Sequence, residues 1–176
     1  GHATAVLAAY PQFATDPSGL DGVAHYPTIF DNVLNFSPES LEFVHEVWSE
    51  VIEATGARYV HIGGDEVPTA HWEASEEVAQ RAREFGVDDP GSIQRWFTLH
   101  MRDWLNERGV TPIGWDEVVD PGPVAGMVCQ SWRGAEQGVK AATQGMDVIM
   151  SPCSHTYFDF YQSDAREEPY GQGDVT

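Results

Sequence analysis

The chain has 176 residues, enough to bury one ordinary core, and 41% of them are hydrophobic and 21% charged, as in soluble globular proteins. The chain has 28 acidic and nine basic residues, which give a formal net charge of −19. This charge can serve only to keep the surface soluble, and it also repels phosphate backbones and anionic lipids. These values argue against a nucleic-acid partner and against a membrane partner, and no apolar run is long enough to span a bilayer.

Neither end of the chain nor its cysteines indicate a compartment. No charged-then-apolar leader opens the sequence, and Gly1 to Thr4 read as interior sequence, so localisation stays open. The two cysteines, Cys129 and Cys153, lie beside predicted strands and lack C-x-x-C spacing. They are predicted to be free, largely buried thiols.

In chain order, the first predicted element is a long irregular loop over 1–36, because this stretch is rich in Pro, Gly, Asp and Asn. Ser37 as a cap and Pro38 as the first helical residue then predict a helix that ends at Gly56. The remaining predictions are a strand over 58–62, helices over 75–85 and 92–108, strands over 110–115 and 127–132, a helix over 135–143, a strand over 146–151, and a loop tail over 163–176.

Helices and strands mostly alternate over 37–162, which is the pattern of βα units around a parallel sheet. Polar and aromatic side chains follow the carboxyl end of each of the four strands, where parallel α/β folds carry their chemistry. These side chains are Asp65, Glu66, Trp115, Asp116, Gln130, Trp132, His155, Tyr157 and Asp159. We therefore expect an α/β fold with these residues around the mouth of a barrel rather than at one switch point of an open sheet.

The strongest local signal is the run H-I-G-G-D-E at 61–66. Two glycines directly after a strand allow a sharp turn and the close approach of a ligand. The adjacent carboxylates Asp65 and Glu66 then point in different directions, and their pKa values can separate so that one group holds a proton near neutral pH. Glycoside hydrolysis needs such an acid at the leaving oxygen and a negative charge near the anomeric carbon, although Asp-Glu pairs are also common on solvated surfaces.

The chain resembles the β-N-acetylhexosaminidases of glycoside hydrolase family 20, which work by substrate-assisted catalysis and carry an H-x-G-G-D-E signature. Four further segments resemble the family in the same order: G-H-A-T-A-V-L-A-A-Y-P at 1–11, P-I-G-W-D-E at 112–117, V-C-Q-S-W-R-G at 128–134 and S-P-C-S-H-T-Y-F-D-F-Y at 151–161. The resemblance implies roughly strands four to seven of a (β/α)8 TIM barrel with their helices. It also implies hydrolytic release of terminal non-reducing GlcNAc or GalNAc from a glycan or chito-oligosaccharide, with neither cofactor nor metal.

The resemblance also implies roles for the acidic pair and for a tyrosine. Glu66 would protonate the glycosidic oxygen and then activate water as a base. Asp65 would orient the 2-acetamido group, whose own carbonyl oxygen attacks the anomeric carbon and gives an oxazolinium intermediate. Tyr157 would donate its hydroxyl to that attacking oxygen and hold the reactive geometry.

Four more residues receive roles in the same way. Trp115 and Trp132 would enclose the acetamide methyl group, and Asp159 would hydrogen-bond a distal sugar hydroxyl. His2 matches a histidine that hydrogen-bonds the acid and tunes its proton affinity. Without the resemblance, the two tryptophans would be interpreted as ordinary core residues, and Tyr157 and Asp159 as part of a polar loop.

Other polar residues near the rim are given supporting roles. Strand alternation points His61 away from the rim, which favours support over catalysis. His71 and Trp72 either border a subsite for the leaving group or pack under the loop. Asp116 and Glu117 are predicted to act only behind the residues that contact substrate.

Measured against the resemblance, the chain begins after the third barrel strand and stops before the eighth. We therefore expect residues 1–176 to form a partial catalytic domain that self-associates through open strand edges, with hydrolysis from the intact parent rather than from the isolated piece. Two alternatives stay open: a non-catalytic carbohydrate-binding half-barrel, and a metal-dependent hydrolase. The second has ligand types but lacks H-x-H and H-x-x-x-H spacing; the ligand types are His2, His61, Asp65, Glu66 and Asp116.

Overall fold

The computed structural model describes residues 3–18, 20, 22, 30–164 and 166–168. Helices and strands alternate along most of this part of the chain, and the strands form a four-stranded sheet. With η for a 3₁₀ helix, the elements are α1 (Thr4–Ala9), η1 (Pro11–Phe13), α2 (Pro38–Thr55), β1 (Tyr59–His61), α3 (Ala70–Glu73), α4 (Glu76–Glu84), η2 (Pro90–Ser92), α5 (Ile93–Asn106), β2 (Thr111–Trp115), η3 (Asp116–Val119), β3 (Val128–Ser131), α6 (Ala135–Thr143), β4 (Asp147–Met150) and α7 (Cys153–Thr156).

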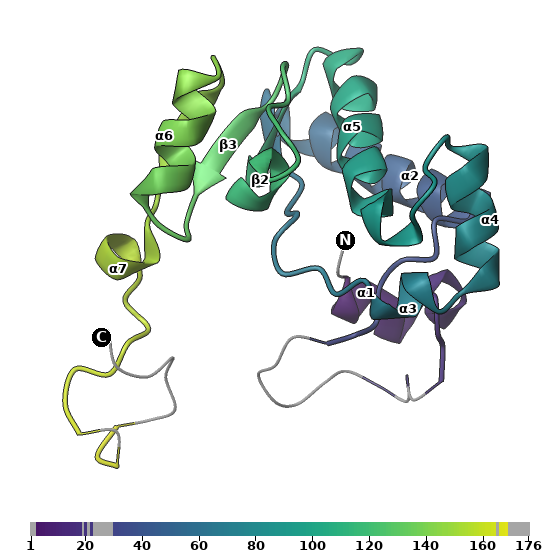
Figure 1. Cartoon of the computed structure of the whole chain (residues 1–176), viewed down its shortest axis with the longest axis horizontal. Coiled ribbons are helices and arrows are strands. Elements are labelled where there is room, and N and C mark those ends of the chain that lie inside the picture. The colour runs from purple at the N-terminus through teal and green to yellow at the C-terminus, as the bar shows by residue number, and fades with distance from the viewer. Residues whose placement is uncertain (1–2, 19, 21, 23–29, 165, 169–176) are drawn as a thin grey trace.

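All four strands are parallel and lie in the order β1-β2-β3-β4. Tyr59 pairs with Thr111, Ile113 with Val128, and Val128 with Asp147. Helix α5 packs on β2, and α6 packs on β3 and β4 (Figure 1). The predicted α/β class is confirmed, and the carboxyl ends of all four strands meet at one edge of the sheet.

Helix α2 begins and ends where the local sequence predicts. The Ser37 hydroxyl accepts a hydrogen bond from the amide of Ser40 at 3.1 Å, which satisfies one of the unpaired donors of the first turn. Pro38 occupies the first helical position, and the amide of Gly56 donates to the carbonyl of Ile52 at 2.8 Å.

The hydrophobic core consists of two clusters. The larger one gathers around α2, α4, α5 and the loop before α2, and its fully buried side chains include Leu7, Phe36, Trp72, Ile93 and Leu105. The smaller one lies between η3, β3 and α6 and contains Val119, Val124, Cys129, Ala141 and Met146. Ile62, directly after β1, packs against both clusters and so couples the strand that precedes the acidic pair to each of them.

Several short helices differ from the sequence-based prediction. The stretch 1–36 was expected to be an irregular loop, but it contains α1 and η1. The Pro- and Gly-rich composition of the whole stretch hides the Ala- and Leu-containing run of α1, which buries Leu7 in the larger cluster. The short helices α3, η2, η3 and α7 were also not predicted, because three or four residues carry too little periodicity to be recognised.

Both cysteines are free: Cys129 is buried and Cys153 is half-buried. Burial, with a further contribution from the negative charge of Asp116, raises the pKa of the Cys129 thiol to about 11. Across the part of the chain that the structure describes, no helix is both long and apolar enough to cross a membrane.

Candidate active site

Six side chains from the four strand ends line one cavity of about 260 Å³. They are the six described residues to which the sequence assigned catalytic or substrate-binding roles: Asp65, Glu66, Trp115, Trp132, Tyr157 and Asp159. They come from positions 65 to 159 of the chain, and the parallel strands bring them to one edge of the sheet. His2, the seventh predicted residue, lies outside the described residues.

Main-chain hydrogen bonds continue between the strand ends and fix their spacing. The amide of Trp115 donates to the carbonyl of Gly63 at 3.0 Å, which ties the end of β2 to the turn after β1. The amide of Cys153 donates to the carbonyl of Trp132 at 2.8 Å and ties the segment after β4 to the segment after β3. These two hydrogen bonds therefore hold the segments that carry the cavity residues next to one another.

The turn after β1 presents the acidic pair through an unusual backbone. Gly63 and Gly64 have φ of +72° and +104°, and Glu66 itself has φ of +43°. A side chain at positive φ costs free energy, and such residues are enriched at functional sites. Asp65 is half-buried and Glu66 is exposed to the cavity mouth, so the two neighbouring carboxylates lie in different surroundings.

Tyr157 stands among negative charges at the cavity. Burial raises the pKa of its phenol, and the charges of Cys153, Asp159, Asp65 and Glu66 raise it further, in that order. A phenol with a raised pKa keeps its proton at neutral pH. Tyr157 is thus a neutral hydroxyl that can donate a hydrogen bond inside an acidic cavity.

Two indoles form the apolar part of the cavity wall. The rings of Trp115 and Trp132 have centroids 6.4 Å apart at an interplanar angle of 70°, which is an edge-to-face arrangement. Behind them, the ring of His61 lies 4.7 Å from Trp115, and its Nδ1 accepts a hydrogen bond from the amide of Gly63 at 3.0 Å. Burial lowers the pKa of His61, against the charge of Asp65, so the neutral ring supports both the turn and the indole.

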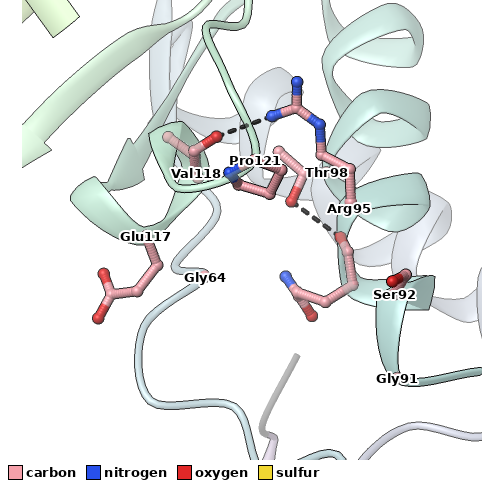
Figure 2. Close-up of a pocket in the computed structure, with 9 residues that line it drawn as sticks. Gly64, Gly91, Ser92, Arg95, Thr98, Glu117, Val118 and Pro121 are labelled. Atoms are coloured by element: carbon pink, nitrogen blue, oxygen red, sulfur yellow. Dashed lines mark hydrogen bonds between the residues drawn. The ribbon is translucent and has the colours of Figure 1, made fainter. Parts of the chain in front are cut away.

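The lining of a second cavity, of about 290 Å³, includes Gly64, which precedes Asp65 in the chain, and Glu117, which follows Trp115 by two residues. Figure 2 shows Val118 opposite Arg95 of α5, with the side chain of Glu117 extending away from α5. The Arg95 guanidinium donates to the Val118 carbonyl at 2.8 Å, so it is engaged by main chain. Since this cavity holds no pair of carboxylates, we assign the acid–base chemistry to the cavity of Asp65 and Glu66.

Of the residues left between two interpretations, Trp72 packs under the loop. Its side chain is fully buried, and its Nε1–H donates to the carbonyl of Leu34 at 2.8 Å. Neither Trp72 nor His71 lines the candidate cavity. Among the described residues, no three His, Cys, Asp or Glu side chains gather in a group that could hold a metal ion.

The sequence predicted Asp116 and Glu117 to act only behind the residues that contact substrate. In the structure both contact Trp132, which lies 16 residues after Asp116 and 15 after Glu117. Local spacing in the sequence does not predict such a contact. The contact follows from the pairing of β2 with β3, because this pairing places the residues after Trp115 beside those after Gln130.

Comparison with known proteins identifies the relatives of this fold and site. A family model described as the catalytic domain of glycosyl hydrolase family 20 matches residues 1–176. A β-hexosaminidase of Porphyromonas gingivalis is 36% identical over 98% of the chain, and one of Vibrio furnissii is 30% identical over 96%. The chain spans 22% and 28% of the lengths of these two curated relatives.

The solved structures include a Vibrio harveyi exo-β-N-acetylglucosaminidase of the same family, in complex with N-acetylglucosamine. It is 31% identical, has a TM-score of 0.75, and is matched over 92% of this chain and 26% of that one. The comparison confirms the predicted partial (β/α)8 barrel. The numbering of the strands within the barrel stays a prediction.

Proposed function

Because the chain belongs to glycosyl hydrolase family 20, we propose that it supplies catalytic residues for removing terminal, non-reducing N-acetylhexosamine from glycans or chito-oligosaccharides. Residues 1–176 would form part of one catalytic domain. The observation that carries the proposal is the single cavity lined by two adjacent carboxylates, two indoles, a phenol and a third carboxylate. Its volume of about 260 Å³ lies near the lower end for small-molecule sites and suits one sugar unit better than several.

The proposed reaction uses the substrate's own amide as nucleophile. The acetamide carbonyl oxygen attacks the anomeric carbon while the glycosidic C–O bond breaks, and Glu66 gives its proton to the leaving oxygen. The resulting oxazolinium ion carries positive charge near its nitrogen, and the carboxylate of Asp65 stabilises that charge. Glu66 then takes a proton from water as the water attacks the anomeric carbon, the C–O bond to the acetamide breaks, and the configuration is retained.

The remaining residues hold the substrate in this geometry. Tyr157 is a phenol and therefore neutral near pH 7, and it donates to the attacking carbonyl oxygen. Trp115 and Trp132 enclose the acetamide methyl group, and Asp159 accepts a hydrogen bond from a distal hydroxyl. His2 is proposed, from the family pattern alone, to hydrogen-bond the acid.

The test is hydrolysis of a chromogenic N-acetylglucosaminide by the protein at its full natural length. Glu66→Gln should lower kcat by about 10² to 10⁴ on a natural glycoside, because general acid catalysis supplies that much. On an aryl glycoside the loss should be clearly smaller, because a good leaving group needs less protonation. Glu50→Gln, a change on the exposed face of α2, is the matched control and should leave both rates unchanged.

Three outcomes separate the alternatives. Equal losses on both substrates would contradict Glu66 as the acid. Binding of N-acetylglucosamine without hydrolysis by the unaltered protein would favour a carbohydrate-binding role. Inhibition by a thiazoline mimic of the cyclised intermediate, together with inertness toward a glucoside that lacks the acetamide, supports the amide as nucleophile.

We also propose that the 176-residue polypeptide, expressed by itself, associates with further copies. In the described residues β1 and β4 each have one neighbour in the sheet. Apolar side chains are exposed on or near them, with Tyr59 at 61%, Ile149 at 40% and Met150 at 48% exposure. A particle that stays monomeric on light scattering across a hundredfold dilution would contradict this.

A further inference from the structure

The segment after β2 holds the neighbouring strand end through two adjacent carboxylates. Asp116 and Glu117 begin η3, directly after Trp115. Both contact Trp132 and Arg133, the two residues that follow β3. Neither carboxylate lines the candidate cavity itself. Their contacts therefore act on the cavity through Trp132.

Asp116 fixes the main chain of this strand end. Its side chain is fully buried, and its Oδ2 accepts hydrogen bonds from the amides of Trp132 at 2.9 Å and Arg133 at 3.1 Å. Its Oδ1 accepts from the Arg133 guanidinium. A buried carboxylate is stable only with such partners, and each bond is charge-assisted. The backbone position of Trp132 is thus set by the first residue of η3, which follows the neighbouring strand β2.

Glu117 fixes the side chain of the same tryptophan. The Nε1–H of Trp132 lies 3.1 Å from one carboxylate oxygen of Glu117 and 3.3 Å from the other. The N–H is the only hydrogen-bonding group of an indole side chain. With its backbone held by Asp116 and its N–H held by Glu117, the ring has a defined place opposite Trp115, at 6.4 Å between centroids.

Glu117 has a second contact besides the indole. Its Oε1 lies 3.9 Å from Nε of Arg133, which Asp116 and Asp120 also hold. Glu117 also lines the cavity of about 290 Å³ between η3 and α5 (Figure 2). Removal of its carboxylate takes away the acceptor of the indole N–H, and with it the contact that fixes the ring.

We infer that Glu117 is a positioning residue that sets the width of the indole wall and thereby restricts the cavity to a short acyl group on the sugar nitrogen. This inference rests on the proposed function, because it assumes that the indole wall encloses the acetamide. Glu117 does not touch substrate and acts through Trp132. The chemical class selected is a 2-acetamido sugar over one with a longer 2-acylamido chain.

The experiment measures acyl-chain selectivity at the protein's full natural length. The ratio of kcat/KM for a 4-nitrophenyl 2-acetamido glycoside to that for its 2-butanamido counterpart is compared across variants. Glu117→Ala should lower this ratio by roughly tenfold, which is within the range that one or two methylene groups contribute in an apolar pocket. Glu117→Gln keeps an acceptor oxygen for the indole and should restore most of the ratio. General destabilisation lowers both rates together and leaves the ratio unchanged.

A matched control and a double-mutant test show whether Glu117 acts on selectivity through Trp132. Asp120→Ala removes a partner of the same Arg133, at 2.9 Å, without touching Trp132, and should leave the ratio within twofold. Trp132→Phe removes the donor of the same hydrogen bond, the indole N–H. In that background Glu117→Ala should change the ratio by less than twofold, because the contact is already lost. An unchanged ratio in Glu117→Ala, or a full effect in the Trp132→Phe background, would overturn the inference.

Failure of the proposed function gives a different result from failure of the inference about Glu117. If the unaltered protein hydrolyses neither glycoside, the enzymatic proposal falls, and the same ratio is measured for binding of N-acetyl- and N-butanoyl-glucosamine by calorimetry. Loss of binding selectivity in Glu117→Ala would then still support the positioning role. Binding of neither sugar by the unaltered protein would overturn the inference together with the function.

Discussion

Trp72 gives the sharpest stability prediction, because two separable interactions meet in one buried side chain. Its ring is fully buried beside Phe36, with centroids 5.1 Å apart, and its Nε1–H donates to the Leu34 carbonyl at 2.8 Å. It joins α3, which follows the loop after Glu66, to the segment before α2. Trp72→Phe removes the hydrogen bond and part of the ring, whereas Trp72→Ala removes the hydrogen bond and the whole ring.

The cost of Trp72→Phe depends on what happens to the Leu34 carbonyl. The Thr15 hydroxyl also lies 3.1 Å from that oxygen, so the carbonyl keeps a donor when the indole is lost. The hydrogen bond is then worth about 0.5–1.5 kcal/mol rather than the larger cost of an orphaned group. Two lost ring carbons add roughly 1.5 kcal/mol. We expect Trp72→Phe to cost about 2–3 kcal/mol and Trp72→Ala about 3–5 kcal/mol.

The assay is urea unfolding followed by circular dichroism, since the substitution alters tryptophan fluorescence. Thr15→Val in the Trp72→Phe background should cost about 1–3 kcal/mol more than Thr15→Val alone, because the Leu34 carbonyl then has neither donor. Additive effects of the two substitutions, or equal costs for Trp72→Phe and Trp72→Ala, would refute the reasoning.

Three further predictions rest on single features of the structure. Glu66→Gly should be more stable than Glu66→Ala by about 1 kcal/mol in the same unfolding assay, because only glycine adopts the positive φ of this residue without strain; equal stabilities would contradict a strained turn. In Gly114→Ala the new Cβ would lie 2.7 Å from Val118 Cγ1 and 2.9 Å from Met127 Cε, so we expect a loss of about 1–3 kcal/mol that Val118→Ala partly restores. His45 and His100 face each other between α2 and α5 with their Nε2 atoms 3.0 Å apart. Burial lowers the pKa of each imidazole; the positive charges of His100 and Arg108 lower that of His45 further, and the charge of Asp103 opposes the shift at His100. Lowered pKa values favour the neutral rings in the folded state, so their stabilisation is present above about pH 6.5 and is lost as the pH falls through the folded-state values; the urea midpoint should fall less on acidification in His45→Gln, and an identical pH dependence would exclude the pair as its source.

The sequence predicted those parts of the fold that depend on local signals. Helix α2 starts after Ser37 and stops before Gly56, and helix α6 spans Ala135–Thr143, both as predicted, because capping residues and apolar spacing act within one turn or two. The short helices α3 and α7 escaped prediction. Trp72, in α3, is held by burial and by a contact with Leu34, which lies 38 residues earlier in the sequence.

For the candidate site, the strand ends could be predicted and the contacts between them could not. Strand order and the rule that parallel strands end at one edge were enough to expect Asp65, Trp115 and Trp132 near one another. The contact of Glu117 with Trp132 depends on which strand neighbours which and on a side-chain direction beyond the strand. That information arises only when β2 and β3 pair, with Trp115 opposite Gln130.

The turn from Gly63 to Glu66, with positive φ at Gly63, Gly64 and Glu66, has a consequence for protein engineering. Since main-chain torsions aim these two carboxylates, an Asp-Glu dipeptide grafted onto another strand end would point its side chains at other angles and would not line one cavity in the same way. The transferable unit is the whole turn with its two glycines, together with the neighbouring strand whose Trp115 amide caps it at Gly63. A design that copies the carboxylates but straightens the turn should therefore fail to place both of them in one cavity.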